Sequence, residues 1–293
     1  SSASGSTLFV EPRSVLTMGN KLVELESRIR DEERKVLAEL SALVAEETSV
    51  LNQVVAVLRA LDLALARGRY GRWLGGVEPQ LEPAAEAPFR FSGLRHPLLV
   101  WQHKRADGPS VVPISVEVSP ELRVVAITGP NTGGKTVTLK SIGLAALMAR
   151  AGMLLPCSGQ PSLPWCAQVL ADIGDEQSLQ QSLSTFSGHV KRIGRILEAL
   201  QCGSAPALVL LDEVGAGTDP SEGTALATAL LKALADRARL TIATTHFGEL
   251  KALKYDDARF ENASVAFNPE TLSPTYELLW GIPGRSNALA IAT

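Results

Sequence analysis

An eight-residue loop constrains this chain more than any other feature, and its sequence is Gly129-Pro130-Asn131-Thr132-Gly133-Gly134-Lys135-Thr136. The loop fits the pattern G-x-x-x-x-G-K-[ST], in which backbone N–H groups surround phosphates, the lysine neutralises the terminal phosphates and the hydroxyl ligates magnesium. The apolar run Val124–Thr128 leads into the loop, and a helical pattern with apolar residues at 139, 142, 146 and 147 leaves it and ends near Gly152. Val137, directly after the loop, is expected to join the loop residues in binding the nucleotide. The helix N-terminus adds partial positive charge at the phosphates. The sequence therefore predicts a nucleotide phosphate site here rather than an ordinary glycine-rich turn.

A second candidate element is the apolar run at 208–211, which ends in Asp212 and Glu213. Two acids at a strand end are often only solvated, but downstream of a phosphate loop they predict catalytic chemistry. We expect Asp212 to join Thr136 in the magnesium shell. Glu213 would polarise the attacking water, because hydrolysis of a phosphoanhydride needs a positioned nucleophile, and Lys135 would compensate charge on the γ-phosphate.

A third apolar run, Leu240–Thr244, delivers Thr245 and His246 to the same predicted sheet edge. Ligands of open α/β sheets bind at the carboxyl ends of the strands. We therefore expect His246 to sense the γ-phosphate, with a purely structural imidazole as the alternative. Ser184 and Thr185 precede a helical pattern at 191–200, and their spacing alone favours a simple helix cap.

Residues 20–67 contain no glycine or proline, and their apolar residues recur on one helical face. The repeating positions are Leu22, Ile29, Val36, Leu43, Val50 and Val57. An unbroken helix of this length would extend about 70 Å, so we expect a break near 46–49, with Thr48 or Ser49 capping a second helix. Two interpretations remain open, a helix pair packed on itself and an extended lever or coiled-coil arm.

The composition of the chain changes along its length and predicts its domain boundaries. Glycines and prolines at 71–88 predict a linker between a helical segment at 1–70, which begins with a short strand at 7–10, and a nucleotide-binding domain at 89–293. Strands and helices alternate from 89 onward, which predicts an α/β fold with a mixed, mainly parallel sheet flanked by helices. Two runs at 260–267 and 275–280 predict an antiparallel hairpin at one edge.

Charge and cysteine content narrow the partners. The chain has 28 Lys and Arg against 31 Asp and Glu, a net charge of −3, so any nucleic-acid site must be a local concentration of cations.

The spacings of Cys157, Cys166 and Cys202 match neither a metal site nor a redox pair, which predicts reduced thiols and a cytoplasmic protein. The sequence contains no apolar run of about 18 residues, the length that would predict a membrane span. The start is neither a signal peptide nor a methionine, so we expect an excised piece of a longer protein.

The motifs together carry a family resemblance. The phosphate loop, the segments at 172–179 and 184–186, Asp212-Glu213 with the following 214–220, and Thr244-Thr245-His246-Phe247 resemble the ATPase domain of the MutS family. Gly-Ala-Gly-Thr-Asp-Pro at 215–220, Ser-Gly-His at 187–189 and Ile-Pro-Gly-Arg-Ser-Asn at 282–287 are similar to the MutS two branch rather than to mismatch-repair MutS proper.

The resemblance implies an ABC-type P-loop ATPase that uses ATP and Mg²⁺ and works as a homodimer, preceded by the long helices of a lever and core domain. Each nucleotide would lie between the phosphate loop of one subunit and Ser184-Thr185 of the other, with Asp219 near the interface. Ser184 would then reach the γ-phosphate across the dimer. Adenine is expected near residues 111–114.

The resemblance also implies targets. The leading hypothesis is a clamp ATPase that acts on branched or recombining DNA and suppresses homologous recombination. The alternatives are rescue of stalled or collided ribosomes, mismatched-DNA binding in mismatch repair, and a nucleotide-gated interaction module with little turnover. Neither a mismatch-reading domain nor the C-terminal Smr nuclease domain of the branch is found in this sequence, so nuclease activity is not expected from it.

Overall fold

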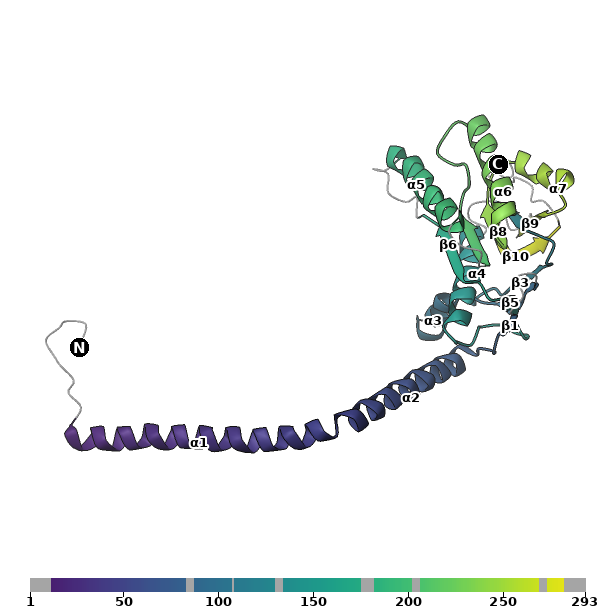
Figure 1. Ribbon diagram of the computed structural model, residues 1–293. Helices are drawn as coiled ribbons and strands as arrows, with labels where there is room; N and C mark the ends of the chain where they lie inside the picture. Colours follow the sequence, from purple (N-terminus) through teal and green to yellow (C-terminus); the bar gives the residue numbers. More distant parts are fainter. Residues whose placement is uncertain are drawn as a thin grey trace. The chain divides into compact units, whose positions relative to one another are not determined.

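The structure is a computed structural model that describes residues 12–82, 87–106, 108–129, 134–174, 182–201, 206–268 and 273–281. Its contacts divide the chain into two compact units, Ser1–Ala64 and Leu65–Thr293 (Figure 1). The division lies inside a helix that ends at Leu74. This helix therefore continues past residue 71, where the linker at 71–88 was expected to begin. The strand expected at 7–10 lies outside the described residues.

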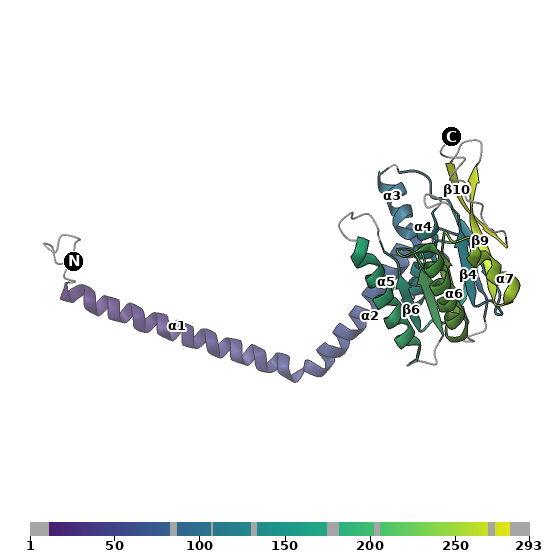
Figure 2. The same ribbon diagram turned by 90° about the horizontal axis from the view of Figure 1, so that it is seen from above.

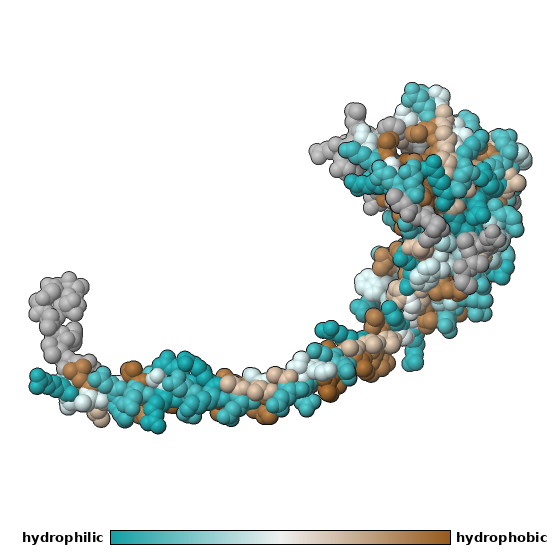
Figure 3. All heavy atoms as spheres, viewed as in Figure 1, coloured by the Kyte–Doolittle hydropathy of each residue, from teal (hydrophilic) through white to brown (hydrophobic). Residues whose placement is uncertain are grey.

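The first unit consists of two consecutive helices, α1 (Arg13–Glu46) and the greater part of α2 (Thr48–Leu74). They meet at Glu47, within the expected break. The expected cap is wrong at Thr48, because its hydroxyl donates backward to the Val44 carbonyl at 3.4 Å instead of accepting from the new helix. No residue of α1 is buried. The described part of this unit is therefore no helix pair packed on itself, and its apolar side chains lie along the exposed surface (Figure 3).

Helix α2 is long and apolar enough to cross a membrane by length and composition, which the sequence analysis did not anticipate. It is the one such helix among the described residues. A single helix of this kind is weak evidence for a membrane span. An exposed apolar helix face equally suits burial against another protein segment.

The main sheet of the second unit has the strand order β10-β9-β4-β8-β7-β6. Five strands run parallel, and they are β4 (Val124–Thr128), β6 (Gln168–Asp172), β7 (Ala207–Leu211), β8 (Leu240–Thr244) and β9 (Phe260–Asn268). The edge strand β10 (Ser273–Trp280) pairs antiparallel with β9, which confirms the predicted hairpin. The mainly parallel α/β sheet is thus as the sequence predicts.

Helices cover both faces of this sheet. Successive side chains of each strand point to opposite faces, so each strand contributes apolar side chains to both helical layers. Val125 and Ile127 of β4 pack in one cluster with α4 (Lys135–Arg150), whereas Val124 packs in the other cluster. Figure 2 shows the sheet between α4 and α6. The second cluster is formed by α5 (Ser182–Gln201), α6 (Pro220–Arg237), the 3₁₀ turn η2 (Glu249–Ala252) and α7 (Leu253–Asp256).

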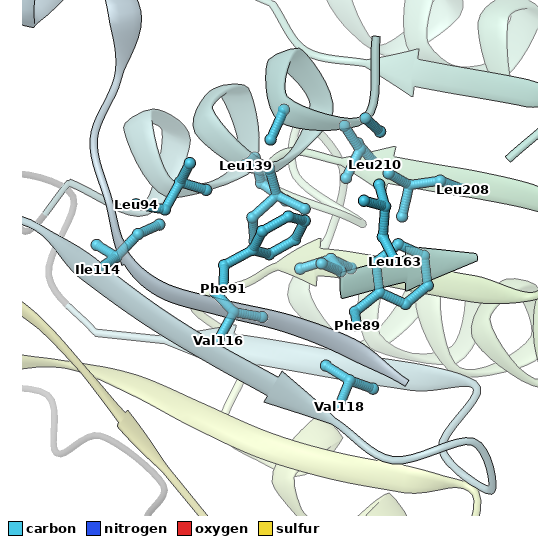
Figure 4. Packing of buried hydrophobic residues seen from close by; sticks show 14 of the residues in the cluster. Phe89, Phe91, Leu94, Ile114, Val116, Val118, Leu139, Leu163, Leu208 and Leu210 are labelled. Atoms are coloured by element: carbon cyan, nitrogen blue, oxygen red, sulfur yellow. The ribbon is translucent and has the colours of Figure 1, made fainter. Parts of the chain in front are cut away.

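A smaller sheet packs on the α4 side, and the sequence analysis did not resolve it. Its order is β1-β5-β2-β3, with β1 (Gln80–Glu82), β2 (Phe89–Leu94), β3 (Ile114–Val118) and β5 (Ser162–Pro164). Phe89 and Phe91 of β2 are fully buried and meet Leu139 of α4 and Leu208 of β7 in one cluster (Figure 4). Helix α3 (Pro97–Ala106) connects β2 to β3.

The glycines that suggested a linker have a packing role instead. Gly71 lies inside α2 and is buried, and a Cβ there would come within 2.6 Å of Leu154 Cδ1. Gly76 faces the same leucine, where a Cβ would lie 2.8 Å from Leu154 Cβ. The last turns of α2 therefore belong to the second unit, held against the chain that follows α4.

Candidate functional site

The predicted motifs meet at the carboxyl ends of three neighbouring strands, β4, β8 and β7. The phosphate loop begins at Gly129, directly after β4, and its last two residues, Lys135 and Thr136, already belong to α4, which Gly134 precedes. Both glycines have positive φ, 135° and 84°, which favours a residue without a side chain. Pro130, Asn131, Thr132 and Gly133 lie outside the described residues.

Lys135 closes the loop on itself. Its side chain is 3% exposed, and Nζ donates to the Gly129 carbonyl at 2.6 Å. Burial lowers the pKa of the ammonium, while the charges of Glu213 and Asp212 oppose that shift. A buried cation beside a loop of this kind is arranged to meet an anion.

Thr136 and Asp212 are in direct contact, as expected for two ligands of one magnesium ion. The Thr136 hydroxyl donates to Asp212 Oδ2 at 2.7 Å. Both groups offer oxygen, which Mg²⁺ prefers, and Mg²⁺ usually completes its shell with waters and phosphate oxygens. The described residues contain no cluster of three or more His, Cys, Asp or Glu side chains suited to a metal.

Thr244 joins Asp212 to Glu213, a role that the sequence analysis missed. Its hydroxyl donates to Asp212 Oδ1 and accepts the Glu213 backbone N–H at 2.8 Å. Glu213 itself has a positive φ of 49°, uncommon for a residue with a side chain. Its backbone is held there by neighbours, since the Val214 N–H also donates to the Thr244 carbonyl at 3.0 Å. Backbone strain of this kind often accompanies functional positions.

His246 lies at the same edge, one residue beyond the buried Thr245. Its ring is exposed and lies against Phe247, with 4.4 Å between ring centroids. Thr245 is fixed to the core, since its N–H donates to the Ile127 carbonyl at 3.1 Å and its hydroxyl accepts the Phe247 N–H at 3.0 Å. The turn that carries His246 is thus anchored beside the end of β4.

The two elements expected to complete a partner's site begin helices. Ser184 and Thr185 lie in the first turn of α5, which starts at Ser182, earlier than the predicted 191–200. Their side chains, like all of 175–181, lie outside the described residues. Asp219 is the N-cap of α6, where its Oδ1 accepts from the Ser221 and Glu222 N–H groups. The Ser221 hydroxyl also donates to Asp219 Oδ1. This hydrogen bond first, and then the two backbone hydrogen bonds, lower the pKa of Asp219.

A buried cluster anchors α5 beside Asp212. Asp172, whose side chain is 3% exposed, accepts from His189 Nδ1 at 2.6 Å and from Arg192 Nε. Its carbonyl accepts the Asp212 N–H at 2.8 Å. His189 and Glu213 line a common cavity of about 20 Å³, which has room for one water. The sequence signal for this cluster was the Ser-Gly-His at 187–189, which identified a family branch but no contact.

A larger cavity of about 400 Å³ adjoins the phosphate loop. Gly134, Val137 and Thr138 form its loop side, and its apolar wall includes Val111, Val112 and Ile114, within the expected adenine segment 111–114. Tyr276 of β10 completes the lining with a positive φ of 63°, and a Cβ on Gly134 would lie 2.9 Å from Tyr276 Cδ1. The sequence analysis did not single out Tyr276.

His96, which the sequence analysis did not single out, also lines this cavity. It is 8% exposed, and its Nδ1 has no hydrogen-bond partner among the described residues. Burial, and then the charge of Lys140, lowers the pKa of the imidazole. A neutral ring here can accept a hydrogen bond from a bound molecule.

The cysteines lie away from this site. Cys157 and Cys166 are buried free thiols, and burial raises their pKa values to about 12 and about 11. Thiols of this kind are unreactive core residues. Cys202 lies outside the described residues.

Comparison with known proteins gives a consistent result. The family model described as MutS domain V matches residues 125–293. A protein of Synechocystis sp. named "Endonuclease MutS2" is 58% identical over 100% of this chain and 38% of its own length. Proteins of the same name from Symbiobacterium thermophilum and Thermomicrobium roseum are 50% and 48% identical over 99% of this chain, and 35% and 37% of their own lengths. The chain thus spans little more than a third of these relatives.

Proposed function

The chain belongs to the MutS family, in its MutS2 branch, and from that premise we propose that it hydrolyses ATP with Mg²⁺ at the edge formed by β4, β8 and β7. One observation carries the proposal. Thr136 in the first turn of α4 and Thr244 of β8 both donate to Asp212, which directly follows β7, so a single carboxylate connects these three elements beside the buried Lys135.

Each residue has a separable role in this proposal. Bound Mg²⁺ would neutralise phosphate charge, and Thr136 and Asp212 would hold it. Lys135 would leave the Gly129 carbonyl for the β- and γ-phosphates. Glu213 would accept a hydrogen bond from water and orient it toward the γ-phosphorus, and the strained turn that Thr244 holds would fix its direction. His246 would contact the γ-phosphate from the end of β8.

The base would occupy the 400 Å³ cavity. Aliphatic side chains at 111–114 form one wall and Tyr276 offers an aromatic face beside Gly134. A flat purine between an apolar wall and an aromatic ring fits such a cavity.

Calorimetry with a non-hydrolysable ATP analogue and Mg²⁺ tests the binding half of the proposal. Lys135→Ala should bind the analogue at least tenfold more weakly, because a buried phosphate charge loses its partner. Lys232→Ala, a substitution of an exposed lysine on α6, is the matched control. Equal affinity of Lys135→Ala and the control would refute this site as the phosphate site.

We also propose that two copies complete each other's sites, with Ser184, Thr185 and Asp219 of one copy facing the nucleotide of the other. The position of both segments at helix N-termini supports this, because such termini attract phosphate. Mixing two inactive variants tests it. Lys135→Ala and Ser184→Ala should together regain about a quarter of the wild-type ATPase rate, since half the dimers are mixed and each holds one intact site. No regain on mixing would refute shared sites.

For the whole protein we propose action on branched or recombining DNA in the cytoplasm, supported by the family and by the relatives' printed name, "Endonuclease MutS2". The full-length protein should bind a four-way junction more tightly than a linear duplex at matched salt. Selective retention of ribosomes instead would favour ribosome rescue, and selective retention of a mismatched duplex would favour mismatch repair.

A further inference from the structure

Helix α3 separates two surfaces of the second unit. Leu99, Gln102 and His103 line the nucleotide cavity. Leu98, Trp101 and Arg105, at the helical spacing i, i+3, i+7, lie on a different face. Leu98 is 62% exposed and Trp101 is 45% exposed, and Arg105 is exposed as well. One side of α3 thus serves the nucleotide cavity while the other is open.

The last turn of α2 lies beside this open face. Lys104 Nζ donates to the Trp73 carbonyl and lies 5.2 Å from the centroid of the Trp73 ring. The Arg105 guanidinium lies 5.7 Å from the centroid of the Trp101 ring. Cations are therefore already held over aromatic rings at this surface.

Charge here departs sharply from the rest of the chain. Residues 65–77 and 87–106 contain seven Lys and Arg and no Asp or Glu, although the whole chain carries a net charge of −3. One of the seven, Arg90, pairs with Glu117 of β3. We define the α2–α3 patch by its six exposed members, Arg69, Arg72, Leu98, Trp101, Lys104 and Arg105. This patch is the local concentration of cations that a nucleic-acid site requires.

We propose that the α2–α3 patch binds a single-stranded segment of nucleic acid. Arg69, Arg72, Lys104 and Arg105 contact its phosphates, and an unpaired base stacks on Trp101. Cations that follow the backbone and an exposed ring that receives a base are the two elements of single-strand recognition. A duplex would offer phosphates to the same cations but no open base to Trp101. None of these residues lines the nucleotide cavity, so the proposal stands apart from the chemistry of the site, and it gives the proposed action on nucleic acid a surface.

The test is fluorescence anisotropy of a labelled single-stranded DNA of roughly 20 nucleotides with this chain, across a series of salt concentrations. Lys104→Glu/Arg105→Glu should weaken binding at least tenfold and reduce the slope of log affinity against log salt by about 1.4, at roughly 0.7 per phosphate contact. The matched control is Lys232→Glu/Arg237→Glu on α6, where both residues are exposed. The control should bind as the wild type does.

A second variant isolates the base contact. Trp101→Ala should weaken single-strand binding about fivefold or more while leaving duplex binding unchanged. Trp165→Ala is its control, because Trp165 is 43% exposed in the same unit. Steady-state ATPase activity of all four variants should match the wild type, which separates this proposal from the proposed hydrolysis.

Three results would overturn the proposal. They are absence of single-strand binding by the wild type at low salt, equal losses in the patch variant and its control, and an unchanged affinity in Trp101→Ala. Capture of an acidic peptide by the wild type but of no oligonucleotide would assign the patch to a protein partner instead. Replacement of Lys104 and Arg105 by Gln repeats the test without introducing negative charge.

Discussion

The Thr136 hydroxyl donates a 2.7 Å hydrogen bond to Asp212 Oδ2, across 76 residues of sequence. Thr136 is in the first turn of α4 and Asp212 directly follows β7, so the contact closes the gap between the phosphate loop and the acids that the sequence placed on a separate strand. Two oxygen donors at this distance can share a magnesium ion, and this relationship gives the proposed site its chemistry.

Removal of the Thr136 hydroxyl should weaken the binding of magnesium without preventing folding. Thr136→Ala should raise the Mg²⁺ concentration that gives half-maximal ATPase activity by roughly tenfold or more. A magnesium titration at saturating ATP measures it. Thr228→Ala on α6, whose hydroxyl donates to the Thr224 carbonyl, should behave as the wild type. An unchanged magnesium requirement in Thr136→Ala would remove Thr136 from the metal shell.

Thr244 should matter for both turnover and stability. Thr244→Val keeps the shape but leaves Asp212 Oδ1 and the Glu213 N–H without their shared partner. We expect the free energy of unfolding to fall by about 1–3 kcal/mol, and kcat to fall more than the affinity for ATP because Glu213 loses its fixed direction. Urea unfolding and steady-state kinetics test this together. A stability loss with an unchanged kcat would show that Thr244 does not position Glu213.

Tyr276 should set the affinity for the base. Tyr276→Ala should raise the KM for ATP several-fold, corresponding to about 0.5–1.5 kcal/mol for an aromatic contact, whereas Tyr276→Phe should restore the wild-type value. The kcat should stay unchanged, because the ring lies on the cavity wall and away from Glu213. Equal KM values for Ala and Phe would show that the ring does not stack on the base.

Alkaline pH should weaken the fold through the buried thiols. Burial raises the pKa of Cys157 from 9.0 to about 12 and that of Cys166 from 9.0 to about 11. Below pH 9 both thiols are protonated in the folded and the unfolded chain. As pH rises above 9 the unfolded chain ionises first, so the free energy of unfolding should fall, at roughly 1.4 kcal/mol per pH unit for each thiol.

Urea unfolding between pH 8 and pH 11 checks this dependence. Cys157→Ala should show a shallower decline than the wild type, since one of the two thiols is gone. Identical slopes in the two proteins would contradict a role for Cys157 ionisation.

The sequence predicted the elements whose signals are local. Strands β4, β7 and β8 are five-residue apolar runs that are buried throughout, and such runs are readable without their neighbours. The residues directly beyond them, Gly129, Asp212 and Thr245, were therefore placed at the correct edge. The hairpin of β9 and β10 was predicted from two runs separated by a short turn segment, although the described side chains of β10 are only partly buried.

Features that depend on distant packing were not predictable. Strands β1 and β5 have three residues each, too few for a periodic pattern, and they pair only because the chain returns after 82 residues, from Gln80 to Ser162. Gly71 was read as a helix breaker because the sequence does not reveal that Leu154 packs against it. Tyr276 reaches the nucleotide cavity only through the pairing of an edge strand, which no single-segment pattern encodes.

The most direct test of the account is the ATPase rate of Glu213→Gln, which keeps the size of the side chain and removes its negative charge. Glu249→Gln, at an exposed position in η2, is the control. We predict a kcat at least about 100-fold lower for Glu213→Gln, with retained binding of the ATP analogue, because the attacking water loses its orienting carboxylate. A Glu213→Gln protein that hydrolyses ATP at the rate of the Glu249→Gln control would contradict the account.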